Sequence, residues 1–496
     1  SPSGLDRGSM CIGTSMEPLK RRLLVGDIVS ARTLLSARGL VVNRGARKVL
    51  RDVDFSLSEG EVVGLLGVNG SGKSTLLESL AGLHPMTGGS IQRNDRGFES
   101  TVRDSEGQRG DISGFGLCLQ TEGMSGDETV LERIRGACRV AGLADNSEAL
   151  NEIISEWGLG HRADDRICKL SGGLRRRVAV LSAIVPVALN SEPSVVLLDE
   201  PSEGLDQSSR GQLLGWLRAL AMRGHGVLVA THDPEVITAC DRTVTISETS
   251  ELTSKVQESN LEHTNLPDPS PSEYHRELVA WTWRLERRNP IDTIGRGVPA
   301  LVALLLAFTL STDIARSSEN YDLLAALILT PAFITAIVTP AIIKRLAEER
   351  AGDWWRAMTG ASSRGWFSIM GVSLILPLPV IYISWFVIAD DTALEAMNSD
   401  VMLWLWLFAF VIIDLSVAAS ALHLMVSDLT RAGAVAGILL QLILIWPFLQ
   451  MTSALTSIMS NGMSFELALG EPIADIAIAW LTVVLLWAMA VIIPED

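Results

Sequence analysis

The sequence predicts two folds in one chain, an α/β phosphate-binding domain and, after it, an all-α domain of six transmembrane helices. The first prediction depends on two segments. Gly67–Thr75 has the pattern of a phosphate-binding loop, and Leu170–Gly173 is a second, unrelated segment able to bind phosphate. The second prediction depends on hydropathy, which rises sharply near residue 290 and then gives six apolar runs. A chain of 496 residues has room for both domains.

Four consecutive parts are expected from composition. Residues 1–30 read as a loose extension without a hydrophobic signal segment, and residues 31–248 as the phosphate-binding domain. Residues 249–272 are polar and carry three prolines, which indicates a flexible linker. Residues 273–496 contain the apolar runs and form the membrane domain.

Charge and cysteine content exclude several classes of protein. The formal net charge of −16 argues against a nucleic-acid partner, which would need a basic face. None of the five cysteines has the spacing of a metal clip or a redox pair, so they are interpreted as reduced cytosolic thiols.

The front half begins with the elements that carry the phosphate-binding loop. Alternating apolar and polar residues from Arg38 to Phe55 predict a small antiparallel sheet, and Val62–Leu66 predicts a buried strand that leads into the loop. In such a loop, backbone N–H groups converge on phosphates, Lys73 reaches the terminal phosphates and the Ser74 hydroxyl holds magnesium. The predicted loop residues are Gly67, Val68, Asn69, Gly70, Ser71, Gly72, Lys73, Ser74 and Thr75.

A second buried strand supplies the acidic groups. The apolar run Ser194–Leu198 ends in Asp199 and Glu200. We expect Asp199 to hold magnesium through water and Glu200 to polarise the water that attacks the terminal phosphate. An Asp-Glu pair after a strand is often only a solvated turn, but here it accompanies a phosphate-binding loop.

These motifs in this order resemble the nucleotide-binding domain of ABC transporters, over Ala37 to Ser247. The resemblance implies an α/β P-loop NTPase fold of the ABC type, with antiparallel β and helical subdomains, and ATP with Mg²⁺ as cofactors. It implies that Gln120 senses magnesium and contacts the membrane domain, and that His232 is the switch histidine. It also implies a signature at Ser171, Gly172 and Gly173, and a D-loop over Ser202–Asp206.

The same resemblance implies a dimer. Two such domains close head to tail, with ATP between the loop of one and the signature of the other. One chain carries one set of motifs, so a second half-transporter is required, and a homodimer is expected. Taken alone, Ser-Gly-Gly is a common turn and an isolated histidine is more often structural than catalytic.

Two positions depart from the family pattern. Leu174 stands where the signature normally has Gln, which removes a polar side chain and leaves the glycine N–H groups. Arg44 replaces the aromatic residue that usually stacks on adenine, and an arginine can stack too. The basic run Arg175–Arg177 is expected to add positive charge near the signature.

Six apolar runs define the predicted membrane domain, and five are long enough to cross a bilayer, for which about 20 residues suffice. Lys and Arg are concentrated in the loops on the side of the soluble half, which places that half and both termini in the cytoplasm and the chain in the cytoplasmic membrane. The runs are 297–311, 321–343, 365–389, 401–426, 432–452 and 473–493.

Two segments beside these runs are expected to contact other parts of the system. Leu278, Trp281 and Leu285 share one face of an amphipathic helix, which is predicted to lie in the membrane interface and resembles the elbow helix of exporters. The segment Glu348–Gly352 occupies the place of a coupling helix, and we expect it to dock in the groove beside Gln120.

The topology resembles the six-helix class of ABC exporters, and a few local patterns resemble the haem exporter of cytochrome c maturation. These patterns are Arg44-Gly45, Arg276-Glu277-Leu278 and Asn289-Pro290. His423, in the fourth run, has three interpretations: a haem ligand, a polar group on a pathway, or a bond to a neighbouring helix.

The sequence thus predicts an ABC half-transporter and ATP hydrolase that exports a hydrophobic or amphipathic substrate, with membrane lipids around it and no nucleic acid. Haem export for cytochrome c biogenesis is one candidate, and efflux of lipid, polysaccharide or drug is the alternative. A different class remains open: a membrane-anchored ABC ATPase that regulates or extracts partner proteins without transport.

Overall fold

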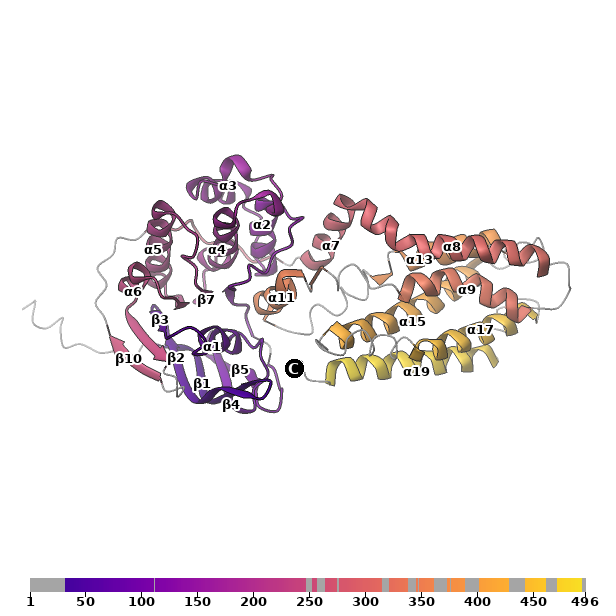
Figure 1. Ribbon diagram of the computed structural model, residues 1–496, viewed down its shortest axis with the longest axis horizontal. Helices are drawn as coiled ribbons and strands as arrows, with labels where there is room; N and C mark the ends of the chain where they lie inside the picture. Colours follow the sequence, from indigo (N-terminus) through magenta and orange to yellow (C-terminus); the bar gives the residue numbers. More distant parts are fainter. Residues whose placement is uncertain are drawn as a thin grey trace, which may run out of the picture.

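The computed structural model shows the two predicted parts side by side along the long axis of the molecule (Figure 1). Strands and helices of the front half form one body, and the helices that follow residue 290, apart from the short one at Ala351–Thr359, run roughly parallel to one another in a bundle beside it. The residues that the structure describes are 32–110, 112–246, 252–256, 264–273, 276–314, 321–337, 345–346, 348–360, 373–374, 376–388, 401–427, 442–460 and 471–492. The predicted extension, 1–30, lies outside them.

The predicted antiparallel sheet is present and has four strands in the order β2-β1-β4-β5. Each strand pairs with its neighbour antiparallel, and one face carries buried leucines and valines, as the alternation predicted. The strands are β1 (Thr33–Arg44), β2 (Arg47–Ser58), β4 (Gly88–Asp95) and β5 (Phe98–Asp104).

The second sheet has six strands in the order β10-β9-β3-β8-β7-β6. All pairs from β9 to β6 are parallel, and their strands are buried on both faces. This is why the central strands β3, β7 and β8 are nearly continuous apolar runs in the sequence, whereas β9, next to the edge, has polar residues. The strands are β3 (Val62–Leu66), β6 (Gly116–Cys118), β7 (Val195–Asp199), β8 (Gly226–Ala230), β9 (Arg242–Ile246) and β10 (Leu252–Val256).

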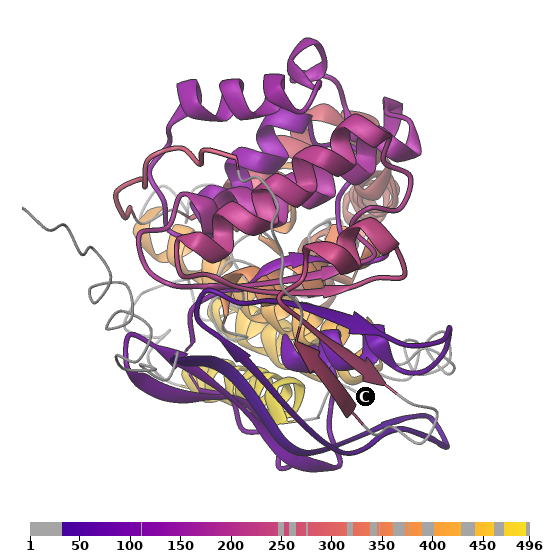
Figure 2. The same ribbon diagram turned by 90° about the vertical axis from the view of Figure 1, so that its left-hand side faces the viewer.

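Residues that alternate along these strands belong to two separate cores. Val196 and Leu198 of β7 pack with the helical layer above the sheet, whereas Val195 and Leu197 pack with α1 and the small sheet below it (Figure 2). The first core includes Trp157 and Trp216, whose rings meet edge to face. The helices are α1 (Lys73–Leu80), α2 (Val130–Val140), α3 (Ser147–Glu156), α4 (Gly172–Ala188), α5 (Gln207–Met222) and α6 (Pro234–Ala239), with short 3₁₀ turns at Gly160–Arg162 and Ile167–Lys169.

The segment predicted as a flexible linker contains structure that the sequence did not reveal. β10 pairs antiparallel with β9 and so extends the sheet beyond residue 248. Farther along, Ser270 donates its N–H to Leu189 and Arg223 donates to the carbonyl oxygens of Leu266 and Pro267. These hydrogen bonds pair backbone N–H and C=O groups of the described residues 264–273, so this segment lies along the helical layer.

The back half contains a helix in each predicted apolar run, but the lengths differ. Two stretches of the described residues are long and apolar enough to cross a bilayer, Leu405–His423 and Pro472–Met489, and the others are shorter. Six spans therefore stay a prediction, and part of the fifth run lies outside the described residues. The helices are α8 (Pro290–Ile314), α9 (Tyr321–Ile337), α13 (Pro377–Ile388), α15 (Val401–Ser427), α17 (Ile445–Ser460) and α19 (Glu471–Ile492).

The amphipathic helix α7 (Glu277–Arg288) forms as predicted, but its apolar face does not point outward. Trp281 and Leu285 are fully buried in a cluster with Ala137 of α2 and Trp355 of α11 (Ala351–Thr359). The prediction that this face contacts the membrane interface is therefore wrong. The reason is that the ATP-binding half and α11 together offer an apolar partner for it, which the sequence of α7 alone does not show.

Candidate nucleotide-binding site

The predicted phosphate loop joins β3 to α1 at the centre of the large sheet. Lys73 opens α1, and its ammonium donates to the carbonyl oxygens of Gly67, at 2.8 Å, and Val68, at 3.4 Å. Gly72 precedes the helix with a φ of 107°, a conformation that residues with a Cβ rarely adopt. No side chain caps this helix start, so its first N–H groups remain available for an anion.

The acidic pair follows β7, next to the loop. Asp199 ends the strand and is buried, and Glu200 comes next with a φ of 48°, in the left-handed region. For a residue with a side chain, that conformation costs about 1–3 kcal/mol and concentrates at functional sites. It is held here by a backbone hydrogen bond from Glu200 to Ala230 on the neighbouring strand, 2.8 Å long.

His232 lies beside Glu200, as the order of motifs predicted. Its Nδ1 is 2.9 Å from the Glu200 carboxylate, and its backbone N–H points at the same oxygen from 3.4 Å. The hydrogen bond to Glu200 raises the pKa of His232 above its usual range. The imidazole itself is three-quarters exposed, so it remains accessible to a ligand on the surface of the loop.

Magnesium fits the residues predicted to hold it. The Oδ2 atom of Asp199 is buried without a hydrogen-bond partner in the described part of the chain, and Ser74 is hydrogen-bonded to the same carboxyl group. Burial raises the pKa of Asp199, and the Ser74 hydrogen bond opposes that shift. A divalent cation next to this carboxylate would stabilise its ionised form, so the orphaned oxygen matches a metal ligand.

The signature residues lie on the other side of the sheet from the phosphate loop. Ser171 caps α4 by accepting the N–H of Leu174, and Gly172 and Gly173 form its first turn. α4 packs in the helical layer, whereas α1 packs in the core on the opposite face. Within one chain, the helices that begin at the loop and at the signature thus pack on opposite faces of the sheet.

The basic run after the signature does not have the role we expected. Arg175 is near Glu122, at 3.5 Å, and Arg177 pairs with Asp206, at 2.8 Å. Arg176 is buried. Their charges are thus engaged with partners of the same chain, because α4 turns each side chain to a different neighbour.

Arg176 is a structural feature of the site that sequence reasoning missed. Its guanidinium donates to the carbonyl oxygens of Leu119, at 2.7 Å, and Glu200, at 2.8 Å, and to that of Asp199. It thereby ties the signature helix to the acidic turn and to the residue before Gln120. The signal available in the sequence was that Arg176 lies one helical turn before Ala179 and Val180, on the face of α4 that carries apolar residues.

Gln120 follows β6 and is exposed, and the segment from the membrane half lies against the residues around it. Phe115 donates its N–H to the carbonyl of Ala357 in α11, at 2.8 Å. A Cβ at Gly114 would overlap the carbonyl oxygen of Met358, so only glycine allows this approach. The guanidinium of Arg133 stacks on the ring of Trp354 with 3.4 Å to its centroid. α11, which follows the predicted segment Glu348–Gly352, therefore packs on residues to either side of Gln120, and a contact of that segment with Gln120 itself stays a prediction.

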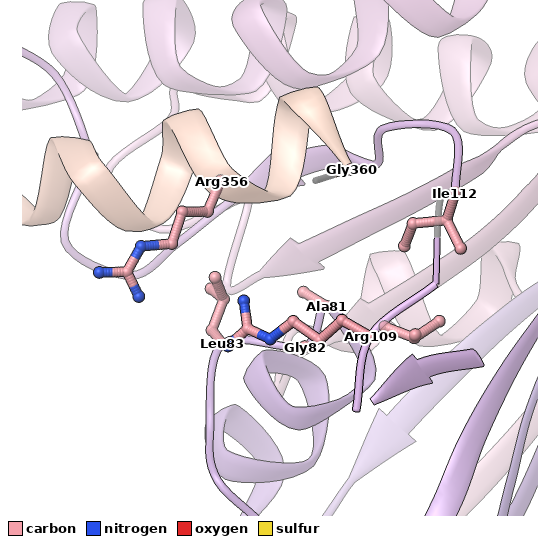
Figure 3. Close-up of a pocket in the computed structure, with 8 residues that line it drawn as sticks. Ala81, Gly82, Leu83, Arg109, Ile112, Arg356 and Gly360 are labelled. Carbon is pink, nitrogen blue, oxygen red and sulfur yellow. The ribbon is translucent and has the colours of Figure 1, made fainter. Parts of the chain in front are cut away.

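A small cavity lies under the end of α11 (Figure 3). Its volume is about 20 Å³, and it is lined by Gly82 and Leu83 after α1, by Arg109, and by Arg356 and Gly360 of α11. That space suffices for about one water molecule. The two halves of the chain are therefore closely packed here, with the loop after α1 on one side and α11 on the other.

Arg44, expected to stack on adenine, ends β1 and is half-exposed. Its guanidinium pairs with the carboxylate of Glu78 at 2.7 Å and lies 2.6 Å from the ring nitrogen of His84. Glu78 is on α1, so the position that the family uses for adenine is linked to the helix after the phosphate loop.

A family model described as "ABC transporter" matches residues 50–203. The lipoprotein-releasing system ATP-binding protein LolD of Saccharophagus degradans is 32% identical over 38% of this chain and 80% of its own length. The iron import ATP-binding protein FbpC of Streptomyces coelicolor is 36% identical over 43% of this chain and 59% of its own. The macrolide export ATP-binding/permease protein MacB 1/2 of Paracoccus denitrificans is 33% identical over 41% of this chain and 30% of its own.

Proposed function

Because the chain belongs to the ABC transporter family, we propose that it is a half-transporter that couples ATP hydrolysis to export of a hydrophobic or amphipathic substrate across the cytoplasmic membrane. Its ATP-binding domain uses ATP with Mg²⁺ and is of the ATP-hydrolysing kind. Export, the substrate, the partner and the topology are the proposed parts.

The proposed chemistry follows from the groups around the loop. The N–H groups of Gly67–Thr75 and the Lys73 ammonium would hold the phosphates, and Ser74, Asp199 and Gln120 would hold magnesium. When bound, the ion neutralises phosphate charge. Glu200 would orient the attacking water and accept its proton, with its carboxylate fixed by His232.

A dimer follows from the separation of the two phosphate-binding segments. Because the helices that begin at the loop and at Ser171-Gly172-Gly173 pack on opposite faces of the sheet, we expect the loop to use the signature of a second chain. We propose that the partner is another copy, which makes the site complete only between chains.

The observation that carries the proposal is the seating of α11 on the ATP-binding half. A transporter needs a rigid contact through which changes at the nucleotide reach the membrane helices. Here the backbone bond from Phe115, just before β6, to Ala357 and the stacking of Arg133, on α2, over Trp354 provide one.

The outward faces of the bundle support a location in the membrane. Large apolar side chains are exposed along α8 and α19, where water would not stabilise them. Together with the flanking basic residues, this favours six spans, with both termini and the ATP-binding domain in the cytoplasm. Exposed residues of this kind include Leu301, Leu305, Leu306, Leu481, Val484 and Leu485.

The substrate is the least constrained part of the proposal. Two of the three patterns that resemble the haem exporter take part in contacts between the halves: Glu277 binds Arg139 at 3.3 Å, and Asn289 bonds to Asp127. His423 contacts the carbonyl oxygen of Ile337 in α9 at 2.8 Å, as a bond to a neighbouring helix. These residues therefore have structural roles, and haem ranks beside lipid, polysaccharide and drug as a cargo to test.

Glu200→Gln tests the proposed mechanism of ATP hydrolysis in the full chain reconstituted in lipid nanodiscs. The amide keeps the hydrogen-bonding shape of the site but cannot accept a proton, so phosphate release should fall by about 100-fold or more. ATP should then hold the protein as a dimer, measured by mass photometry. Glu192→Gln, at an exposed glutamate in the loop before β7 and outside the motifs, is the control and should turn over normally. Normal turnover in Glu200→Gln would overturn the assignment.

Transport is tested separately in proteoliposomes with the same pair of variants. Each candidate cargo is loaded outside the vesicles on the side of the ATP-binding domain, and its ATP-dependent accumulation inside is measured. Accumulation that Glu200→Gln abolishes and Glu192→Gln preserves supports export. Hydrolysis without movement of any cargo would favour a membrane-anchored ATPase that acts on partner proteins.

A further inference from the structure

Glu78 is a buried carboxylate on the helix that follows the phosphate loop. It lies one turn after Ser74 on α1, so the two side chains share a face of the helix. Its side chain is 4% exposed. A carboxylate at such a position is expensive to bury unless cations surround it.

Cationic and hydrogen-bonding groups approach Glu78 from three parts of the chain. One carboxylate oxygen accepts from Arg44 of β1, at 2.7 Å, and lies 2.7 Å from His84, which follows α1. The other oxygen accepts from Arg350, which belongs to the membrane half. Burial alone would raise the pKa of Glu78, but the hydrogen bonds from His84 and Arg350 outweigh it and lower the pKa to about 2.

Arg350 is also held in place by its own backbone conformation and by a contact with α11. Its backbone and that of Glu349 both have left-handed φ values, 59° and 50°, immediately before α11. Its guanidinium also pairs with Asp353 in the first turn of α11, at 2.7 Å. The side chain that reaches Glu78 is thus fixed to the helix that docks beside Gln120, and its backbone conformation is of a kind kept only where the surroundings enforce it.

We propose that Glu78 is a positioning residue that couples the nucleotide site to the membrane half through Arg350. The proposal rests on the function proposed above, since it assumes that ATP binds at the loop. α1 is a short rigid helix that carries Lys73 and Ser74 at one end and Glu78 at the other, so a shift at the phosphates moves the carboxylate. Arg44 binds the same carboxylate as Arg350. Contact between a nucleotide and Arg44 therefore changes the electrostatic attraction between Glu78 and Arg350.

Among the described residues, the other ion pairs between the halves do not involve α1, and one of them joins Arg139 of α2 to Glu277 of α7. Arg288 binds Glu132 on α2, with one N–O distance of 2.6 Å, and Arg345 binds Asp127 before α2, at 2.8 Å. Glu132 lies on α2, in the helical layer, and Asp127 precedes α2 in the chain. Arg288 is therefore a matched control: it makes an ion pair between the halves of similar exposure that does not involve α1.

The experiment measures amide hydrogen exchange of residues 348–360 in the full chain in nanodiscs, in the Glu200→Gln background that retains ATP. ATP should slow this exchange about fivefold or more, the lower end of typical coupling between sites. With Glu78→Gln or Arg350→Gln, the ATP response should fall below about twofold, and Arg350→Lys should restore part of it. Arg288→Gln should leave the response intact.

Binding of a fluorescent ATP analogue to each variant separates the possible failures. If the Glu200→Gln protein itself does not bind the analogue, the proposed function fails. If all variants bind it with similar affinity and Arg350→Gln still shows the full response, the inference about Glu78 is overturned. Arg350→Gln is the deciding variant because Arg350 is partly exposed, so folding does not depend on it as it does on Glu78.

Discussion

The ATP-binding half and the membrane half differ in the partners of their buried charged side chains and in the exposure of their large apolar side chains. In the first, these buried arginines have partners: Arg93 is 1% exposed and binds Asp95 at 2.8 Å, and Arg176 binds three carbonyl oxygens. The orphaned oxygen of Asp199 lies at the proposed magnesium site. In the second, Asp414 is fully buried in α15, and neither of its carboxylate oxygens has a hydrogen-bond partner among the described residues. Large leucines of the second half, such as Leu305, point outward.

This difference indicates that different interactions stabilise the folds of the two halves. Burial of apolar surface from water contributes about 25 cal/mol per Å², so the strands of the first half gain stability wherever both faces are covered. Helices in lipid gain little from burying leucine and depend on packing and on satisfied backbone bonds. The same residue type is therefore expected to matter differently in the two halves.

A tryptophan pair tests that expectation with the largest effect. Trp216 is fully buried in the core of the ATP-binding half, and Trp406 is 63% exposed on α15. Trp216→Ala should destabilise its half by about 3–5 kcal/mol, because it leaves a large cavity against Trp157. Trp406→Ala should cost less than about 1 kcal/mol. Urea unfolding followed by pulse proteolysis, with fragments assigned to each half, measures both.

An equal cost for the two substitutions would contradict the comparison. It would mean that α15 packs its outer face against protein, in a dimer interface for example. Trp406→Phe distinguishes the cases, since a ring that lies in lipid tolerates that change and a ring in a packed interface loses a tryptophan-sized contact.

The comparison also explains what the sequence could and could not predict. Lys73, Asp199 and Glu200 follow buried strands at fixed spacing, so the local pattern was enough to predict where the loop and the acidic turn form. Arg176 was missed because its partners, Leu119 and Glu200, come from distant strands. A pattern within one helix does not show which side chain turns inward.

The contact between the halves was predicted only in outline. Docking of Glu348–Gly352 beside Gln120 came from the order of segments, but the pairing of Arg350 with Glu78 joins residues far apart in the chain. The burial of Trp281 and the edge strand β10 were missed for a related reason. Each depends on a partner surface that only the assembled fold provides.

Acid should weaken the ATP-binding half through His225. This histidine is buried, and its Nδ1 accepts the N–H of Ser194 at 3.1 Å. Burial, with a contribution from Arg223, lowers its pKa to about 4 from an ordinary 6.5. The unfolded chain therefore binds the proton more readily than the folded chain, and stability present above pH 6.5 is lost as the pH falls toward 4. The loss amounts to about 3 kcal/mol at 1.36 kcal/mol per unit.

His225→Gln should remove most of that pH dependence between pH 7 and pH 5 in the same urea assay. The amide oxygen can still accept from Ser194 and does not titrate in this range. Glu78 does not confound the result, because its stabilising effect is lost only below its ordinary pKa of 4.5. His423→Gln, in the membrane half, should leave the pH dependence of the ATP-binding half unchanged. An unaltered slope in His225→Gln would show that another group carries the effect.

The smallest expected effect concerns the signature, where the ATP-binding half departs from its family. Leu174 is partly buried against the helical core, and its N–H is bound to Ser171 rather than free. Leu174→Gln should change the turnover of ATP by less than about threefold, because the N–H groups of Gly172 and Gly173 supply the anion contacts in either case. Leu214→Gln, a partly buried leucine on α5 against the same core, controls for lost packing. A rise of tenfold in Leu174→Gln, without one in Leu214→Gln, would mean that the missing polar side chain limits hydrolysis between chains.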